Sequence, residues 1–272
     1  MTRRKEREAL KVVLGIDAAW TATQPSGVAL AVEGPLGWKL SAVAASYEAF
    51  TSQVIDVQRK KPRGSMPEPS ALLAAATSLV GAPVTLVAID MPLSRLPIVS
   101  RRVSDNKVSS LYGARHAGTH TPSALRPGRL SDDLTKGFAR EGYPLITSGG
   151  TLPALIEVYP HPALIELAVA NRRLPYKHGK ARAYWPEDDR LTRRRKLYEV
   201  WGGIIELLET RIRGVATALT LPDLGCRGYE LKAFEDALDA VVCAWVGVRV
   251  LDGTAKPYGD DTSAIWIPNQ GA

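Results

Sequence analysis

Residues 12–32, VVLGIDAAWTATQPSGVALAV, contain a strand pattern that ends on a single carboxylate. The run at 12–16 is apolar without polar alternation, and it stops at Asp17. Such a run is typical of a central strand that is covered on both faces. A turn of small and polar residues follows, and a second strand begins near Ser26. The stretch therefore predicts an acid at the end of a buried strand.

A second apolar run repeats this pattern. Residues 83–92, PVTLVAIDMP, end their apolar run on Asp90, and Pro92 prevents the strand from simply continuing. If the two strands are parallel and adjacent, Asp17 and Asp90 lie at the same edge of the sheet. In open α/β sheets, sites form beyond the carboxyl ends of the strands. We therefore expect a functional site at this edge.

A third acidic motif, EDALDAVV, lies in a helix expected over 230–250. Asp236 and Asp239 are three residues apart, so they share one helix face. Beyond Asp239 the helix is apolar almost all round, which predicts burial. Several buried carboxylates need partners, and a hard cation such as Mg²⁺ is a suitable one. Taken singly, Asp17 could close a strand-end turn and Asp236 could cap the helix.

The rest of the chain predicts a mixed α/β domain. Further strands are expected at 27–33, 37–46, 154–160 and 264–268, and further helices at 68–80, 130–141, 162–172 and from about 190. Apart from the helix at 130–141, residues 93–151 form a basic, loop-rich insertion. We expect one domain over 12–268, between a basic N-terminal tail at 1–11 and a C-terminal tail at 269–272.

Composition is that of an ordinary globular protein with a basic surface. Of the 272 residues, 45% are hydrophobic and 23% charged, and the formal net charge of +7 favours a polyanionic partner. Cys226 and Cys243 form neither a metal pattern nor a disulfide framework, which fits a reducing cytosol. No apolar run is long enough to predict a membrane span, and the charged start argues against secretion. A cytoplasmic location without membrane contact is expected; the oligomeric state is left open.

Five motifs together resemble a known family. GIDAAW…SGVALAV, VAIDMPLS, EVYPHPAL, DALDAVVCAW and the late IWIP resemble the DUF429 family of predicted ribonuclease H-like nucleases, over roughly 12–268. The set is also similar to the wider ribonuclease H-like superfamily, especially resolvases of the RuvC type. Those begin with an Ile-Asp strand, carry a second acid at the end of the fourth strand, and have a late helix with two aspartates.

The resemblance implies a ribonuclease H-like α/β fold, with a mixed five-stranded sheet flanked by helices. It also implies a four-acid site for Mg²⁺ or Mn²⁺, made by Asp17, Asp90, Asp236 and Asp239. Two cations in such a site activate water and stabilise the leaving oxygen of a phosphodiester. Asp17 would bridge the cations, and Asp90 stands where the resolvases have Glu.

Several further residues have two interpretations each. Glu157 could add or orient a metal ligand, or pair with an arginine in the core. His161 could act as a general acid or contact the scissile phosphate, or pack in its loop. Six cations could bind substrate phosphates or be merely solvated: Arg101, Arg102, Arg115, Arg126, Lys177 and Lys180. No aromatic ladder for stacking single strands is evident.

The leading hypothesis is a divalent-metal-dependent nuclease, a hydrolase of phosphodiester bonds in DNA or RNA. One alternative is a nucleic-acid-binding or scaffold protein of the same fold without activity, in which the acids serve folding alone. Another is an ATP-binding phosphotransfer protein, although DAAWTATQPSG at 17–27 is poor in the glycines of a phosphate hairpin.

Overall fold

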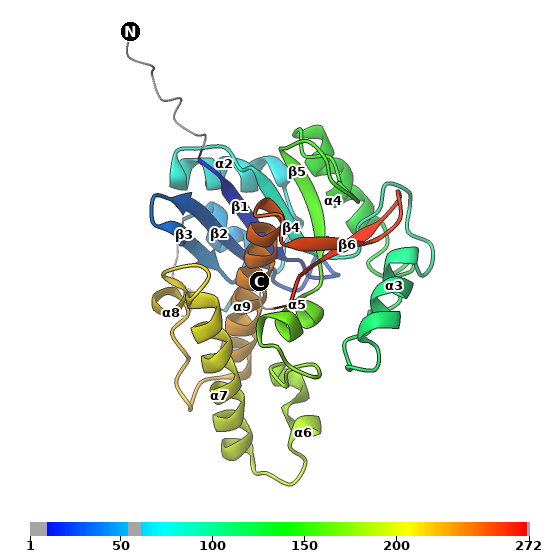
Figure 1. The fold of residues 1–272 in the computed structure, drawn as a ribbon. Coiled ribbons are helices and arrows are strands. Elements are labelled where there is room, and N and C mark those ends of the chain that lie inside the picture. The colour runs from blue at the N-terminus through cyan, green and yellow to red at the C-terminus, as the bar shows by residue number, and fades with distance from the viewer. Residues whose placement is uncertain (1–9, 54–60, 271–272) are drawn as a thin grey trace.

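A seven-stranded mixed sheet forms the centre of the molecule (Figure 1). The computed structural model describes residues 10–53 and 61–270, so most of the predicted tail at 1–11 lies outside the described residues. The strand order is β3-β2-β1-β4-β5-β7-β6. The strands are β1 (Val12–Asp17), β2 (Gly27–Gly34), β3 (Gly37–Ala44), β4 (Leu86–Asp90), β5 (Ala154–Val158), β6 (Ala255–Gly259) and β7 (Ala264–Pro268).

The inner strands β1, β4, β5 and β7 run parallel, and β2, β3 and β6 add antiparallel neighbours at the two sides. Both faces of β1 are buried. Val13 packs in a core with residues of α9, whereas Leu14 packs in a second core on the other face. This two-sided burial explains the unbroken apolar run of the strand.

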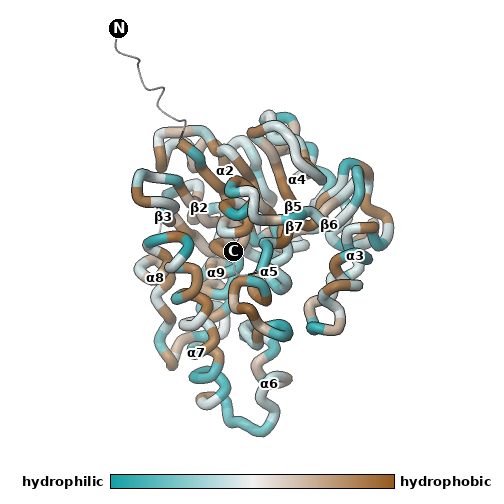
Figure 2. Tube along the Cα trace, in the orientation of Figure 1, coloured by the Kyte–Doolittle hydropathy of each residue, from teal (hydrophilic) through white to brown (hydrophobic). Residues whose placement is uncertain are grey.

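Helices cover the two faces separately. The first core includes residues of α5 (Pro160–Leu167), α7 (Arg190–Glu209), α8 (Val215–Ala218) and α9 (Gly228–Leu251). The second includes residues of α1 (Tyr47–Thr51), α2 (Pro69–Val80) and α4 (Arg129–Arg140). Figure 2 shows the apolar segments gathered in the central strands and α9, and hydrophilic residues in the connection between α6 (Ala181–Tyr184) and α7.

Two glycines set the position of α9 on the sheet. A Cβ atom on Gly15 would overlap the backbone of Ala240 and Ala244, and one on Gly27 would overlap the backbone carbonyl of Asp236. The absence of these side chains lets the helix backbone lie directly on β1 and β2. As a result, the acidic part of α9 is held beside the end of β1.

The predicted central strands and the long helices are confirmed, and three expectations are wrong. The sheet has seven strands rather than five, because the hairpin β6–β7 extends it beyond β5. The insertion expected to be loop outside 130–141 contains a further helix, α3 (Val103–Tyr112), whose N-terminus is capped by Asp105. Helix α5 ends at Leu167, short of 172.

The short elements α1, α6, α8, β6 and the 3-10 turn η1 (His178–Lys180) were not predicted. Among the described residues, no helix is both long and apolar enough to cross a membrane.

Candidate active site at the carboxyl end of the sheet

Asp17 and Asp90 lie side by side at the ends of two parallel strands. The register of β1 and β4 pairs them directly, and each is the last residue of its strand. Loss of hydration raises the pKa of Asp90 well above its usual range, and the negative charges of Asp17 and Asp239 raise it further. Lys177 opposes this shift. The sheet therefore creates a crowded carboxylate pair that needs positive charge nearby.

Helix α9 adds two buried acids, Asp236 and Asp239. Asp239 accepts a hydrogen bond of 2.8 Å from the Tyr176 hydroxyl and pairs with the ammonium group of Lys177. Burial raises its pKa to about 6, although Lys177 opposes the shift. Asp236 pairs through Oδ1 with Lys232, whereas its buried Oδ2 has no hydrogen-bond partner among the described residues.

The two lysines meet at a third acid of α9, Glu235. Its Oε1 lies 3.4 Å from Nζ of Lys177 and 3.7 Å from Nζ of Lys232, and its Oε2 accepts the backbone N–H of His178 at 2.6 Å. Burial acts to raise the pKa of Glu235, but the hydrogen bonds from His178 and the lysine charges lower it to about 2. Acids and ammonium groups thus form one alternating network.

A pocket of about 540 Å³ opens onto this network. Asp17, Asp90 and Asp236 line it, together with Arg126, Lys177 and Lys232; Trp20 and His120 contribute two rings. Asp239 is fully buried and is not part of the lining. The pocket therefore combines acids with cationic and aromatic side chains, drawn from β1, β4, α9 and three connections between elements.

The carboxylates suit a hard cation in kind, because all their donors are oxygens. The unpartnered Oδ2 of Asp236 is a buried acceptor of the sort that a cation would satisfy. As they stand, however, no three acidic, histidine or cysteine side chains of the described residues are grouped to hold a metal ion. Lys177 and Lys232 instead pair with oxygens of Asp239 and Asp236.

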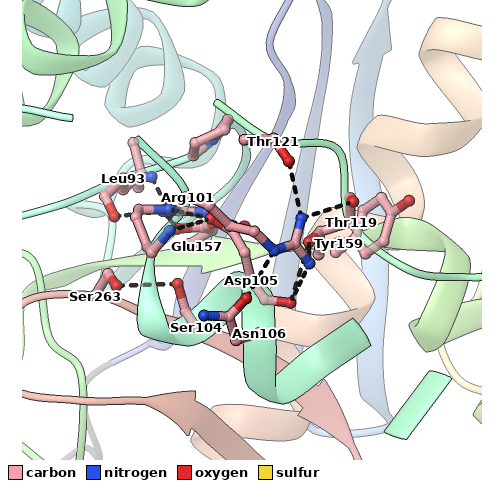
Figure 3. A network of polar contacts seen from close by, with 12 residues as sticks. Leu93, Arg101, Ser104, Asp105, Asn106, Thr119, Thr121, Glu157, Tyr159 and Ser263 are labelled. Atoms are coloured by element: carbon pink, nitrogen blue, oxygen red, sulfur yellow. Dashed lines mark hydrogen bonds and ion pairs between the residues drawn. The ribbon is translucent and has the colours of Figure 1, made fainter. Parts of the chain in front are cut away.

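Glu157 does not line the pocket and lies in a buried ion pair next to it, where its charge acts on Asp90. Its two oxygens accept from the guanidinium of Arg102 at 2.5 and 2.7 Å, and Oε2 also accepts the Leu93 N–H at 2.8 Å (Figure 3). Arg102 pairs in turn with Asp105 of α3. Burial raises the pKa of Glu157 to about 7, against the effect of Arg102. The pair joins β5 to α3 and to the segment after β4.

The remaining predicted cations divide into two groups. Arg101 donates to Asn106 and to the hydroxyls of Thr119 and Thr121, which flank His120 (Figure 3). Arg115 pairs with Glu166 at 2.8 Å. These arginines, like Arg102, bind other parts of the protein. Of the six predicted cations, Arg126 and Lys177 line the pocket, and Lys180 is exposed in η1.

His161 is buried between two tyrosines and does not line the pocket. Its ring meets Tyr159 and Tyr176 edge-on, with centroids 5.2 and 5.4 Å apart. Burial lowers the pKa of His161 well below its usual range, and nearby cations such as Arg173 lower it further. The imidazole is therefore neutral and packs behind Tyr176, which itself holds Asp239.

The model of one protein family, described as "Protein of unknown function (DUF429)", matches residues 71–263. The chain belongs to the DUF429 family. The match includes three of the four aspartates, and Asp17 precedes it. No curated protein and no solved structure matched. The description of DUF429 assigns no activity, so the functional argument for this member depends on its site.

Several side chains of the site in this DUF429 protein were not predicted from the sequence, among them Tyr176, which donates to Asp239. Lys232 and Glu235 could have been found, because they lie four residues before Asp236 and Asp239 on the same helix. Trp20 follows Asp17 by three residues, so its position near the carboxylates could also have been inferred. No sequence pattern places His120 near the acids, because it lies in the long connection from α3 to α4, whose path cannot be predicted from the sequence.

Proposed function

We propose that this DUF429 protein is a divalent-metal-dependent nuclease of ribonuclease H-like fold, with Asp17, Asp90, Asp236 and Asp239 as its cation ligands. The observation that carries the proposal is the convergence of acids at the carboxyl ends of β1 and β4. Asp17 and Asp90 share one rung of the sheet, and Asp236 lines the same pocket. The charge of Asp17 acts on the pKa values of the other three acids.

The order of the elements supports the ribonuclease H-like assignment. Asp17 ends the first strand, Asp90 ends the fourth strand, and both remaining aspartates lie on the late helix α9. This is the order of acids that the resemblance to RuvC-type resolvases implies. The hairpin β6–β7 extends the sheet at one edge, where β5 separates it from β4 and Asp90.

When bound, the cations would activate the attacking water and stabilise the leaving oxygen. The protein's own contribution would be to hold the four acids in place and to pair two of them with ammonium groups beforehand. Lys177 and Lys232 do the latter through direct pairs with Asp239 and Asp236. Asp236 and Asp239 would hold the cations through oxygens that now pair with the two lysines, and the ammonium groups would then be available to an anionic substrate.

The cationic lining supports a nucleic acid as the substrate. Arg126, Lys177 and Lys232 face the same pocket as the acids, and the chain carries a formal net charge of +7. Cations next to a carboxylate site attract phosphates, with the salt dependence that counterion release produces. The proposal covers both DNA and RNA.

A cleavage assay tests the proposal. Labelled single-stranded, duplex, hybrid and branched substrates are incubated with Mn²⁺ or Mg²⁺, using the parent and the variants Asp17→Asn and Asp90→Asn. Asp133→Asn, an exposed acid of α4, is the matched control. We expect metal-dependent cleavage by the parent and the control, with a loss of about a hundredfold or more in the two site variants. Melting curves with Mn²⁺ provide a readout independent of activity.

The lysine pairs also favour a second candidate, a nucleic-acid-binding protein without hydrolytic activity. In that case Lys177 and Lys232 are permanent partners of the acids, and no cation replaces them. Mn²⁺ would then leave the melting temperature of the parent unchanged, and no substrate would be cleaved. That pair of results would overturn the nuclease proposal in favour of this one, provided that nucleic acid still binds.

A further inference from the structure

The lining of the acidic pocket includes two rings and a guanidinium group that the proposed hydrolysis does not use. Trp20 lies in the connection from β1 to β2, and His120 and Arg126 lie in the connection from α3 to α4. The ring centroids of Trp20 and His120 are 6.4 Å apart, with the planes at 84°. The Arg126 guanidinium carbon lies over the Trp20 ring, 5.9 Å from its centroid.

We propose that these three side chains form a subsite for one unpaired nucleobase, so that the substrate class is single-stranded nucleic acid or an unpaired end. The inference rests on the proposed nuclease function and names its substrate. Bases of single strands stack on aromatic rings and on the planes of arginine side chains. Trp20 and Arg126 supply both kinds of surface in the pocket that holds Asp17 and Asp90.

The stacking surface is held in place by the protein. Trp20 is partly buried and packs against the core beneath α1 and α2, so its ring is fixed on one side while it lines the pocket. On the other side, Arg101 holds the segment around His120 through the hydroxyls of Thr119 and Thr121. Trp20 and the segment around His120 are therefore ordered before a base arrives, and only Arg126, which lies over the Trp20 ring, has to move aside or join the stack.

Three cationic side chains lie near the subsite, although acids line the same pocket. Arg126, Arg173 and Lys180 all act on His120, whose pKa is lowered first by burial and then by these charges. In the described part of the chain, none of the three forms an ion pair with a carboxylate, and the buried Nε of Arg173 has no hydrogen-bond partner. Phosphates on either side of the stacked base would supply the missing negative charge.

The location of the rings favours an unpaired strand over a duplex. Trp20 and the acids line one concave pocket, so a base that reaches the ring must leave its own stack. Unstacking and unpairing cost a few kcal/mol in a duplex and little in a strand that is already single. The subsite therefore selects single strands, duplex ends with unpaired bases, and flaps.

Binding without cleavage tests the inference. A labelled oligothymidine of about 12 nucleotides and a duplex of equal length are titrated in chelator, with every protein carrying Asp17→Asn. Trp20→Leu keeps apolar bulk but removes the aromatic face, whereas Trp20→Phe keeps a face. We expect about tenfold weaker single-strand binding for Trp20→Leu, a loss of less than about threefold for Trp20→Phe, and unchanged duplex binding for both.

Arg126→Ala provides a second variant that does not disturb the core. It should weaken single-strand binding and reduce the slope of log affinity against log salt by about one. Arg140→Ala, which removes an exposed arginine at the end of α4, is the matched control. It should change neither the affinity for single strands relative to duplex nor the slope of single-strand affinity against salt. Oligothymidine should also quench tryptophan emission of the parent, and Trp20→Phe should lose that quenching.

The outcomes separate the subsite from the proposed function. If single strands bind equally well to Trp20→Leu, Arg126→Ala and the parent, the subsite is overturned and the nuclease proposal stands. If Trp20→Leu weakens single-strand and duplex binding alike, the role of Trp20 is structural, and the subsite is again overturned. If the parent background binds no nucleic acid at all, and the unmutated protein cleaves none, both proposals fail together.

Discussion

Asp17 and Asp90 occupy the same rung of the parallel pair β1–β4, so two carboxylates face one pocket from adjacent strands. Their proximity destabilises the metal-free protein at neutral pH, because the Asp17 charge adds to the burial that raises the pKa of Asp90. This relationship leads to the first prediction.

Asp17→Asn should leave the melting temperature in chelator unchanged or raise it, because it removes one of two repelling charges. Because the pKa of Asp90 is raised in the folded parent, Asp90 takes up a proton as the pH falls, the repulsion from Asp17 is relieved, and the melting temperature of the parent should rise. Asp17→Asn lacks this repulsion, so its melting temperature should rise less than that of the parent over the same pH range. Melting curves between about pH 7 and 5 measure both effects. A clear destabilisation of Asp17→Asn at neutral pH in chelator would mean that Asp17 holds the fold.

Gly15→Ala should destabilise the protein severely, because its new Cβ would overlap the backbone of α9. The helix would have to move off β1 and carry Asp236 and Asp239 with it. We expect a loss above about 4 kcal/mol, or failure to fold. Gly202→Ala in α7 is the matched control: a Cβ there meets nothing within 4 Å, so it should be neutral or stabilise by up to about 1 kcal/mol. Equal effects in urea unfolding would contradict the close approach of α9.

The central strands could be predicted because β1 and β4 are covered on both faces and therefore read as unbroken apolar runs. Helix α3 could not, because its sequence, VSDNKVSSLY, is mostly polar and only Val108 and Tyr112 are buried apolar residues. Its stability depends on distant partners, above all the bond from Arg102 to Glu157. Strand β6 contains Pro257 and lies at the sheet edge, where proline is tolerated but the strand signal is weak.

The site likewise contains residues that the sequence could predict and residues that it could not. Asp17 and Asp90 could be placed together from strand-end positions alone, and Asp236 and Asp239 share a helix face by spacing. Lys232 follows from its spacing to Asp236 on the same helix, but the Lys177 partner of Asp239 was beyond such reasoning, because the two residues are 62 positions apart in the chain. Arg102 and Arg115 also show why basic residues in an insertion are weak indicators of substrate binding. Both pair with buried acids of the fold, which charge counting does not reveal.

Glu235 should contribute stability that depends on pH. Its folded pKa of about 2 lies below the ordinary 4.5, so the stabilisation is fully present above about pH 4.5 and is lost as the pH falls toward 2. Glu235→Gln should therefore cost up to about 3 kcal/mol at neutral pH, and the difference from the parent should shrink in acid. Urea unfolding across this range measures it, with Glu199→Gln, an exposed acid of α7, as control. A cost that does not depend on pH would point to lost packing.

Lys177→Met separates a permanent ion pair from one that a cation can replace. Removing the ammonium group leaves Asp239 buried with its Tyr176 hydrogen bond alone among the partners described, and the loss of one member of a buried pair costs about 3 kcal/mol. In chelator we expect a lower melting temperature than in Lys136→Met, which removes an exposed lysine of α4.

If a divalent cation uses the same carboxylate, it no longer competes with Lys177 in this variant. Mn²⁺ should then stabilise Lys177→Met by more degrees than it stabilises the parent, and half of the effect should be reached at a lower Mn²⁺ concentration. Lys136→Met should respond as the parent does. An equal or smaller response of Lys177→Met would show that the lysine and the cation do not share Asp239, and that the acids of α9 belong to the fold.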